Sequence, residues 1–326
     1  MSRGSHKKRD TNVGRRMIRL GTLFALISTS FFAVAAGTPA SAASSAPGYW
    51  LEAGDGGIFT FGAPFEGSAA SDTARCPANP PARAMPDGTC WSMAPTADGN
   101  GYWILNAYSG VIYPYGDAVS YGEPADTSAY GGGADTWPNA IGIVAPDGRG
   151  YWVLEQGLSG LGSVQSFGDA ANYGDETNIA HGTAHVGKPV ALAATHDGKG
   201  YWIVDSDGGV FSFGDAAFYG SMGGAHLNAP VVGIAVTSDG NGYWLAGADG
   251  GVFSFGSAAF GGSMADTVLV EPIIGIAGNA RGTGYWLAGA DGGVFAFGGA
   301  PFLGSLGGQD LNRPVFAINS LSLPAG

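Results

Sequence analysis

Two histidines in the middle of the chain have a spacing that could hold a metal ion. His181 and His185 are four residues apart, so on a helix their imidazoles would lie on one face. The surrounding stretch AHGTAHVG contains two glycines, which disfavour a helix. A loop without a ligand is therefore the favoured interpretation, and the sequence predicts neither a bound metal nor another cofactor.

A group of aromatic and acidic residues could bind a sugar. Trp137 precedes Pro138, and Tyr130 and Asp135 lie close by in the sequence. An exposed aromatic ring beside a carboxylate suits a sugar ring. The alternative is that Trp137 anchors its loop against a neighbouring repeat. These aromatic and acidic residues and the two histidines are the candidate binding residues.

The only two cysteines, Cys76 and Cys90, lie 14 residues apart in a proline-rich stretch. A metal site would need further ligands, and no histidine lies between them. In an exported protein such a pair is typical of a disulfide, so we expect one that closes this loop.

No motif in the chain indicates a particular enzyme. The sequence has no nucleophile elbow, no zinc-binding His-Glu-x-x-His and no phosphate-binding loop. A carboxylate pair for glycoside hydrolysis could be assembled from distant repeats, but the sequence does not select one pair among its many acids. An enzyme is therefore the less favoured function.

The first 42 residues are predicted to be an export signal. Basic residues precede a moderately apolar stretch from Leu20 to Ala36, and a small-residue cleavage site ends at Ala42, so the mature chain would begin at Ala43. An uncleaved membrane anchor is the alternative. The Arg15-Arg16 pair also leaves the twin-arginine export route open beside the general one.

Removal of this segment makes the chain strongly acidic. The whole sequence has 14 Lys and Arg and 26 Asp and Glu, of which seven cations and one acid lie in residues 1–42. Residues 43–326 therefore carry 7 cations and 25 acids, a net charge of −18. Nucleic acid is excluded as a partner because its phosphates need clustered cations. A second long apolar run is lacking, so no membrane span is expected in the mature form.

A Gly-Tyr-Trp triplet recurs six times and organises the mature chain. The repeats open near residues 48, 101, 150, 200, 242 and 284, and their tyrosines are 42 to 53 residues apart. In the unit at 231–263, apolar runs alternate with Asp-Gly turns, which favours four antiparallel strands, the outermost at Ala259–Ser263. Tyr and Trp point to opposite faces of one strand, so both faces of each sheet must be buried.

We therefore predict an all-β fold, a six-bladed β-propeller of four-stranded antiparallel blades over residues 43–326. The first triplet lacks a preceding strand, and the stretch 314–323 is such a strand without a triplet. The C-terminal strand should therefore close the first blade. An open solenoid is the alternative. In this arrangement the 59 glycines punctuate turns, and the aromatic residues, 12% of the chain, pack between blades.

The repeat unit resembles one found in secreted, largely actinobacterial proteins, built on Gly-Tyr-Trp-Leu, Asp-Gly-Gly-Val-Phe and Phe-Gly. It is more loosely similar to the regulator of chromosome condensation repeat, to which DGGVFSFG at 249–256 corresponds. The resemblance covers nearly the whole mature chain. It implies a propeller at the cell surface or outside the cell, and it implies no particular activity.

The longest segments between strands fall on one face of the predicted ring. They are 69–90, 124–137, 157–163 and 176–188. Insertions on one face of a repeat array often mark a binding face, although neutral variation of loops is the alternative. We expect a secreted module that binds or scaffolds an extracellular carbohydrate, a cell-wall component or a protein. The alternatives are a carbohydrate-active enzyme, a hydrolase or lyase with carboxylates on that face, and a structural surface protein.

Overall fold

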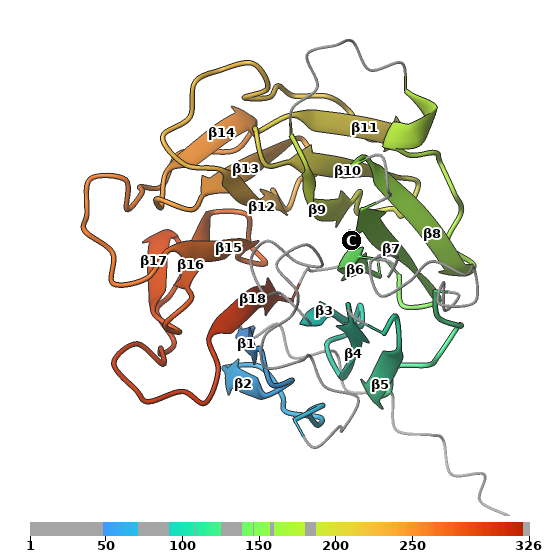
Figure 1. Ribbon diagram of the computed structural model, residues 1–326, viewed down its shortest axis with the longest axis horizontal. Helices are drawn as coiled ribbons and strands as arrows, with labels where there is room; N and C mark the ends of the chain where they lie inside the picture. The colour runs from blue at the N-terminus through green and yellow to red at the C-terminus, as the bar shows by residue number, and fades with distance from the viewer. Residues whose placement is uncertain are drawn as a thin grey trace, which may run out of the picture. The chain divides into compact units, whose positions relative to one another are not determined.

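Six antiparallel sheets of three strands each make up the computed structural model (Figure 1). The residues that the structure describes are 48–70, 91–107, 109–124, 139–145, 147–156, 160–179 and 187–321. Within them no helix is long and apolar enough to cross a membrane. The one helical turn among the labelled elements is η2 (Glu176–Asn178).

Each sheet is one blade, with its strands in the order inner, middle, outer. Blade 1 combines β18 (Val315–Ser320), β1 (Tyr49–Ala53) and β2 (Ile58–Phe61). Blade 2 contains β3 (Trp91–Pro95), β4 (Gly101–Asn106) and β5 (Ile112–Gly116). Blade 3 contains β6 (Asn139–Val144), β7 (Gly150–Gln156) and β8 (Gly162–Gly168).

The other three blades repeat this plan with shorter connections. Blade 4 contains β9 (Pro189–Ala194), β10 (Gly200–Asp205) and β11 (Val210–Gly214). Blade 5 contains β12 (Val231–Val236), β13 (Gly242–Gly247) and β14 (Val252–Gly256). Blade 6 contains β15 (Ile273–Gly278), β16 (Gly284–Gly289) and β17 (Val294–Gly298).

The inner strands close a ring. In the order β3, β6, β9, β12, β15 and β18, each lies beside the next, and β18 lies beside β3 again (Figure 1). The predicted closure of the first blade is confirmed, because β18 pairs antiparallel with β1 and Leu51 is opposite Ile318. The solenoid alternative is excluded by this pairing.

The hydrophobic core lies between the blades rather than at one centre. Every residue of the middle strands is buried apart from Gln156. One inter-blade cluster joins Trp244 of blade 5 to Tyr285 of blade 6, whose rings lie 5.2 Å apart with a tilt of 51°. The predicted burial of both faces by the Tyr-Trp pair is therefore confirmed. Truncation of a buried tryptophan to alanine typically costs about 3–5 kcal/mol.

The predicted fourth strand of the blades is wrong for the described residues. Ala259–Ser263 and the corresponding stretches of the other blades form no strand, and each sheet ends at its third strand. Side chains take the place of ladder bonds, because Trp244 Nε1 donates to the carbonyl of Ala259 and Tyr285 Oη donates to the carbonyl of Gly262. Gly262 also has a φ of +132°, which a regular strand does not allow.

Candidate functional site

The binding residues expected from the sequence lie outside the described residues. They are Tyr130, Asp135, Trp137, His181 and His185. Cys76 and Cys90 lie outside them as well, as does the predicted cleavage site between Ala42 and Ala43. These assignments stay predictions. The structure instead draws attention to three features that the sequence reading missed: the outer rim, the central cavity and a set of buried carboxyls.

The outer rim is formed by the segment after each outer strand, and two buried side chains hold it. In blade 5, Trp244 Nε1 donates to the carbonyl of Ala259 at 2.8 Å. On the other side of Phe260, the Tyr285 hydroxyl of blade 6 accepts from the N–H of Gly261 at 3.2 Å and donates to the carbonyl of Gly262 at 2.6 Å. The Tyr-Trp pair therefore holds the rim of its own blade and that of the preceding blade.

A large aromatic side chain projects from this held segment in four of the six blades. The residue directly after the carbonyl that accepts from Trp Nε1 is phenylalanine in blades 1, 4, 5 and 6. These four side chains are between 58% and 62% exposed, so they share one environment. We call them the phenylalanine arc: Phe65, Phe218, Phe260 and Phe302. Blades 4, 5, 6 and 1 follow one another around the ring, so the four phenylalanines lie in consecutive blades.

Blades 2 and 3 have polar residues at the same place. Trp103 Nε1 donates to the carbonyl of Val119, so the equivalent residue is Ser120, and Trp152 Nε1 donates to the carbonyl of Ala171, so it is Asn172. The fold therefore accepts Ser and Asn where the other blades have Phe. The repeated Ala-Phe and Pro-Phe pairs could have revealed the arc in the sequence, but they looked like part of a fourth strand.

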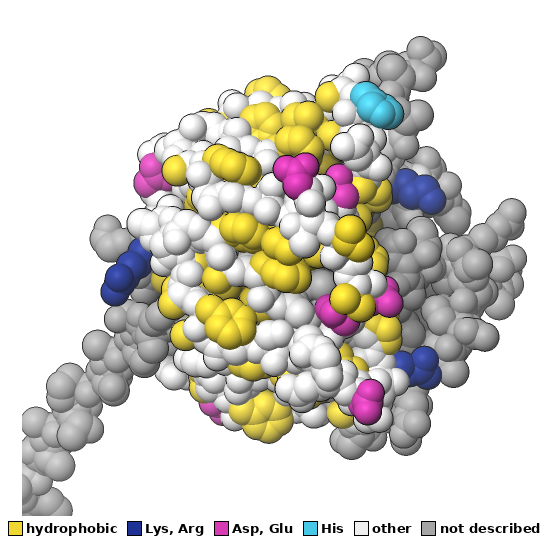
Figure 2. Space-filling view, turned by 90° about the vertical axis from the view of Figure 1, so that its left-hand side faces the viewer, with side chains coloured by type: hydrophobic (Ala, Val, Ile, Leu, Met, Phe, Trp, Pro, Cys, Tyr) yellow, Lys and Arg dark blue, Asp and Glu magenta, His cyan; other side chains and the backbone are white. Residues whose placement is uncertain are grey.

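The side of the ring that carries β14 and β17 in Figure 1 is shown in Figure 2. Hydrophobic side chains lie scattered over it as separate groups, with acidic side chains between them and basic ones near its edges. The four rim segments that carry the arc, 63–69, 216–222, 258–264 and 300–306, contain one charged residue, Glu66, and no Lys or Arg. This surface therefore suits an uncharged partner better than an anionic one.

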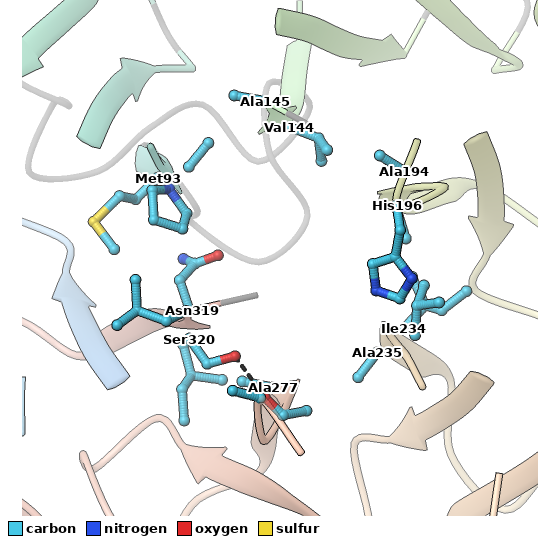
Figure 3. Close-up of a pocket in the computed structure, with 18 of the residues that line it drawn as sticks. Met93, Val144, Ala145, Ala194, His196, Ile234, Ala235, Ala277, Asn319 and Ser320 are labelled. Atoms are coloured by element: carbon cyan, nitrogen blue, oxygen red, sulfur yellow. Dashed lines mark hydrogen bonds between the residues drawn. The ribbon is translucent and has the colours of Figure 1, made fainter. Parts of the chain in front are cut away.

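A cavity of about 220 Å³ occupies the middle of the ring, at the end where the inner strands finish. Small and branched apolar side chains line most of it, among them Val144 and Ala235. Asn319 and His196 extend into it from different blades (Figure 3). The Ser320 hydroxyl is bound to the carbonyl of Gly278 at 2.7 Å. Among the described residues that line it, His196 is the one ionisable side chain, and none of them is a carboxylate.

One carboxyl group is buried between blades 1 and 2. Glu52 occupies the position in β1 that Leu105 and Leu154 fill in the next two blades, and it is fully buried. Among the described residues its oxygens have no hydrogen-bond partner, and neither has the nearby indole nitrogen of Trp91. Burial raises the pKa of Glu52 to about 8. The group is therefore largely protonated at neutral pH.

Two further carboxyls meet between blades 3 and 4. Asp175 caps η2 by accepting from the N–H of Thr177, and this turn directs Glu176 into the interface, where it accepts from the N–H of Gly162 at 2.6 Å. Asp205, at the end of β10, faces it and is also fully buried. The pKa of Asp205 is raised to about 8, chiefly by burial. The negative charge of Glu176 and a hydrogen bond between the two carboxyls raise it further. The pair holds a proton across the interface.

The position of Asp205, at the end of the middle strand, is polar in three adjacent blades. The residue equivalent to Asp205 is Asn106 in blade 2 and Glu155 in blade 3. Burial raises the pKa of Glu155, and a hydrogen bond donated by Gln165 at 2.7 Å partly opposes this rise. Blades 5 and 6 have Gly247 and Gly289 there. The buried acids therefore lie in the half of the ring that carries the long connecting segments.

The acidic residues of the hairpin turns have a structural role. Asp207 accepts from the N–H of Gly209 at 2.9 Å, and Asp249 and Asp291 make the same bond to Gly251 and Gly293. These are Asx turns. Among the described residues no group of three His, Cys, Asp or Glu side chains is placed to hold a metal ion.

Comparison with known proteins supports the fold and nothing finer. No protein-family model matches the chain, and no curated protein is similar to it. Among solved structures, a chain in the crystal structure of a nidogen/laminin complex is similar to it, with a TM-score of 0.51 and 10% identity. The match covers 86% of this chain and 100% of that one. It supports the β-propeller architecture that the six sheets show.

Proposed function

We propose that the exported chain is a non-catalytic binding or scaffolding module. Its partner is an extracellular carbohydrate, a cell-wall component or a protein. The phenylalanine arc is the observation that carries this proposal. Phenylalanine is enriched at contact surfaces relative to the rest of a protein surface, and here it is left exposed at the equivalent place in four successive blades.

The placement of the acids supports a module without catalytic activity. Glycoside hydrolysis needs two carboxylates that both reach the substrate. The described carboxyls with strongly raised pKa values, Glu52 and Asp205, are fully buried in blade interfaces. None of the described residues that line the central cavity is an acid.

The resemblances are in keeping with an extracellular partner. The repeat resembles that of secreted, largely actinobacterial proteins, and we propose that this chain is of the same type. The nidogen/laminin complex contains this fold in an assembly of proteins, which keeps a protein among the proposed partners.

A carbohydrate-active enzyme is the second candidate, and the Glu176–Asp205 pair favours it. A proton shared between two carboxyls is a device that hydrolases use. In this alternative, an opening between blades 3 and 4 would give substrate access to the pair. The variant E176Q would then abolish any activity.

The experiment is a binding and turnover assay on the protein secreted by a bacterial host. The protein is mixed with purified bacterial cell walls, before and after protease treatment, and with insoluble polysaccharides. Sedimentation measures binding, and assays for released sugar, including unsaturated products, measure turnover. We expect binding to at least one of these without product. Product release that E176Q abolishes would establish the enzyme, and an absence of binding to all of them would refute the module.

A further inference from the structure

We propose that the phenylalanine arc binds an uncharged polysaccharide along the rim of the ring. This inference rests on the proposed function and names its surface and its ligand class. Three properties of the rim restrict the class of partner. They are the fixed position of its phenylalanines, the lack of cations in its four segments, and the repetition of the same contact in successive blades.

The geometry presents four rings in a defined position. On one side of each phenylalanine, a buried Trp Nε1 holds the preceding carbonyl, at 2.7–2.9 Å in all four blades. After each ring, a Tyr hydroxyl of the next blade donates to a glycine carbonyl two residues further on. A ring on a segment held at both ends loses little freedom on binding, which favours affinity.

The chemistry of the surface fits a sugar polymer without charge. Phenyl rings contact the C–H face of a pyranose ring through dispersion and burial of apolar area. A phosphorylated or sulfated polymer would need cations, and the four rim segments have none. Glu66, beside Phe65, adds a negative charge that repels such a polymer further.

The repetition fits a partner that itself repeats. Four rings at one structural position in consecutive blades offer the same contact four times. A polymer of identical sugar units can use several contacts at once, so weak single contacts add up to firm binding. A folded protein partner has no reason to meet the same side chain at each step around the ring.

The test compares polysaccharide binding by variants that the fold already accepts. The triple variant F218N/F260N/F302N places in three blades the residue that Asn172 provides in blade 3. V268N, at a side chain that is 98% exposed outside the arc, is the control. In the reverse direction, S120F/N172F completes the ring of phenylalanines. Circular dichroism and thermal unfolding confirm that each variant is folded.

The measurement is the depletion of protein by insoluble cellulose and by chitin, two uncharged polymers of different source, with soluble dextran sulfate as an anionic competitor. Each lost ring should weaken binding about threefold to tenfold, and the triple variant about 30-fold or more. V268N should bind as the original does, and S120F/N172F should bind more tightly. Dextran sulfate should not compete.

Several results would overturn this inference and leave the broader function in place. One is unchanged polysaccharide binding by the triple variant. Another is binding to cell walls that protease treatment removes, with no binding to either polymer, which would indicate a protein partner. A third is self-association that the triple variant abolishes, seen by light scattering, which would assign the arc to a second copy. Failure to bind any of these materials would instead refute the module itself.

Discussion

The hydroxyl of Tyr49 donates a hydrogen bond to the carbonyl of Gly304, a residue 255 positions later in the sequence. This bond joins blade 1 to the rim of blade 6. The other five interfaces have the same bond, for example from Tyr243 in blade 5 to Gly220 in blade 4. The interface that closes the ring is therefore built like the others.

Removal of this hydroxyl tests that equivalence. Y49F should lower the free energy of unfolding by about 1–2 kcal/mol, because the carbonyl of Gly304 loses its partner in a partly buried place. Y243F, which removes the same bond from an interface between consecutive blades, is the matched comparison. Urea unfolding measures both. A loss for Y243F with none for Y49F would contradict the closure described for blade 1.

The buried carboxyl of Glu52 should make stability depend on pH. The pKa of Glu52 is raised from 4.5 to about 8 in the folded protein, so the folded state binds more protons than the unfolded state between these values. The contribution of Glu52 to the free energy of unfolding is therefore fully present below about pH 4.5. It is lost progressively as the pH rises from there through about 8.

Leucine at this position should remove the effect. E52L places in blade 1 the residue found in blades 2 and 3, and it should raise the free energy of unfolding at pH 9 by on the order of 3 kcal/mol relative to pH 5. Urea unfolding at the two pH values measures the difference. E66Q, at an exposed acid, is the control and should behave as the original. Equal gains for E52L at both pH values would show that Glu52 is not protonated in the fold.

The carboxyl pair between blades 3 and 4 gives a second dependence of the same sign. Above pH 8, Asp205 loses its proton beside Glu176, and two buried negative charges repel each other. D205N keeps the size and hydrogen-bonding capacity of the side chain without that charge. It should stabilise the protein by about 1–3 kcal/mol at pH 9 and change little at pH 5. A D205N variant that is less stable at both values would indicate that ionised Asp205 stabilises the interface.

Export and oxidation can be checked on the secreted protein itself. We expect N-terminal sequencing to begin at Ala43, and the proposed disulfide between Cys76 and Cys90 would lower the intact mass by two hydrogens relative to the reduced chain. C76S/C90S should lose about 2–4 kcal/mol of stability. Recovery of an uncleaved chain in the membrane fraction would support the anchor alternative, and two free thiols would refute the disulfide.

The repeat made the propeller predictable, because residues of the triplet have the same surroundings in every blade. Tyr285 and Trp286 bury opposite faces of β16 as expected from their adjacency on a strand. The absence of a fourth strand could not be predicted from the sequence. Its sequence is compatible with a strand, and only the tertiary structure shows that Trp and Tyr from two blades take its carbonyls.

Glu52, the phenylalanine arc and the carboxyl pair were harder to predict, because what sets them apart depends on the tertiary structure. Glu52 lies in a strand predicted to be covered on both faces, but the sequence does not show that its carboxyl lacks a partner among the described residues there. Phe260 looks like an ordinary strand residue until the segment that carries it is seen to leave the sheet. The pairing of Glu176 with Asp205 joins a link to a strand 29 residues later, and no local pattern reports such a contact.

The pairing of β1 with β18 also sets the order in which this molecule can be completed. Of the strands in the described residues, β1 is the first in the sequence and β18 is the last. While the chain is being synthesised, the middle blades can form one after another as their strands emerge. The first blade lacks its inner strand until β18 has been synthesised, after the strands of all the other blades. The ring is thus finished in a single last step, which joins the oldest part of the nascent chain to the newest.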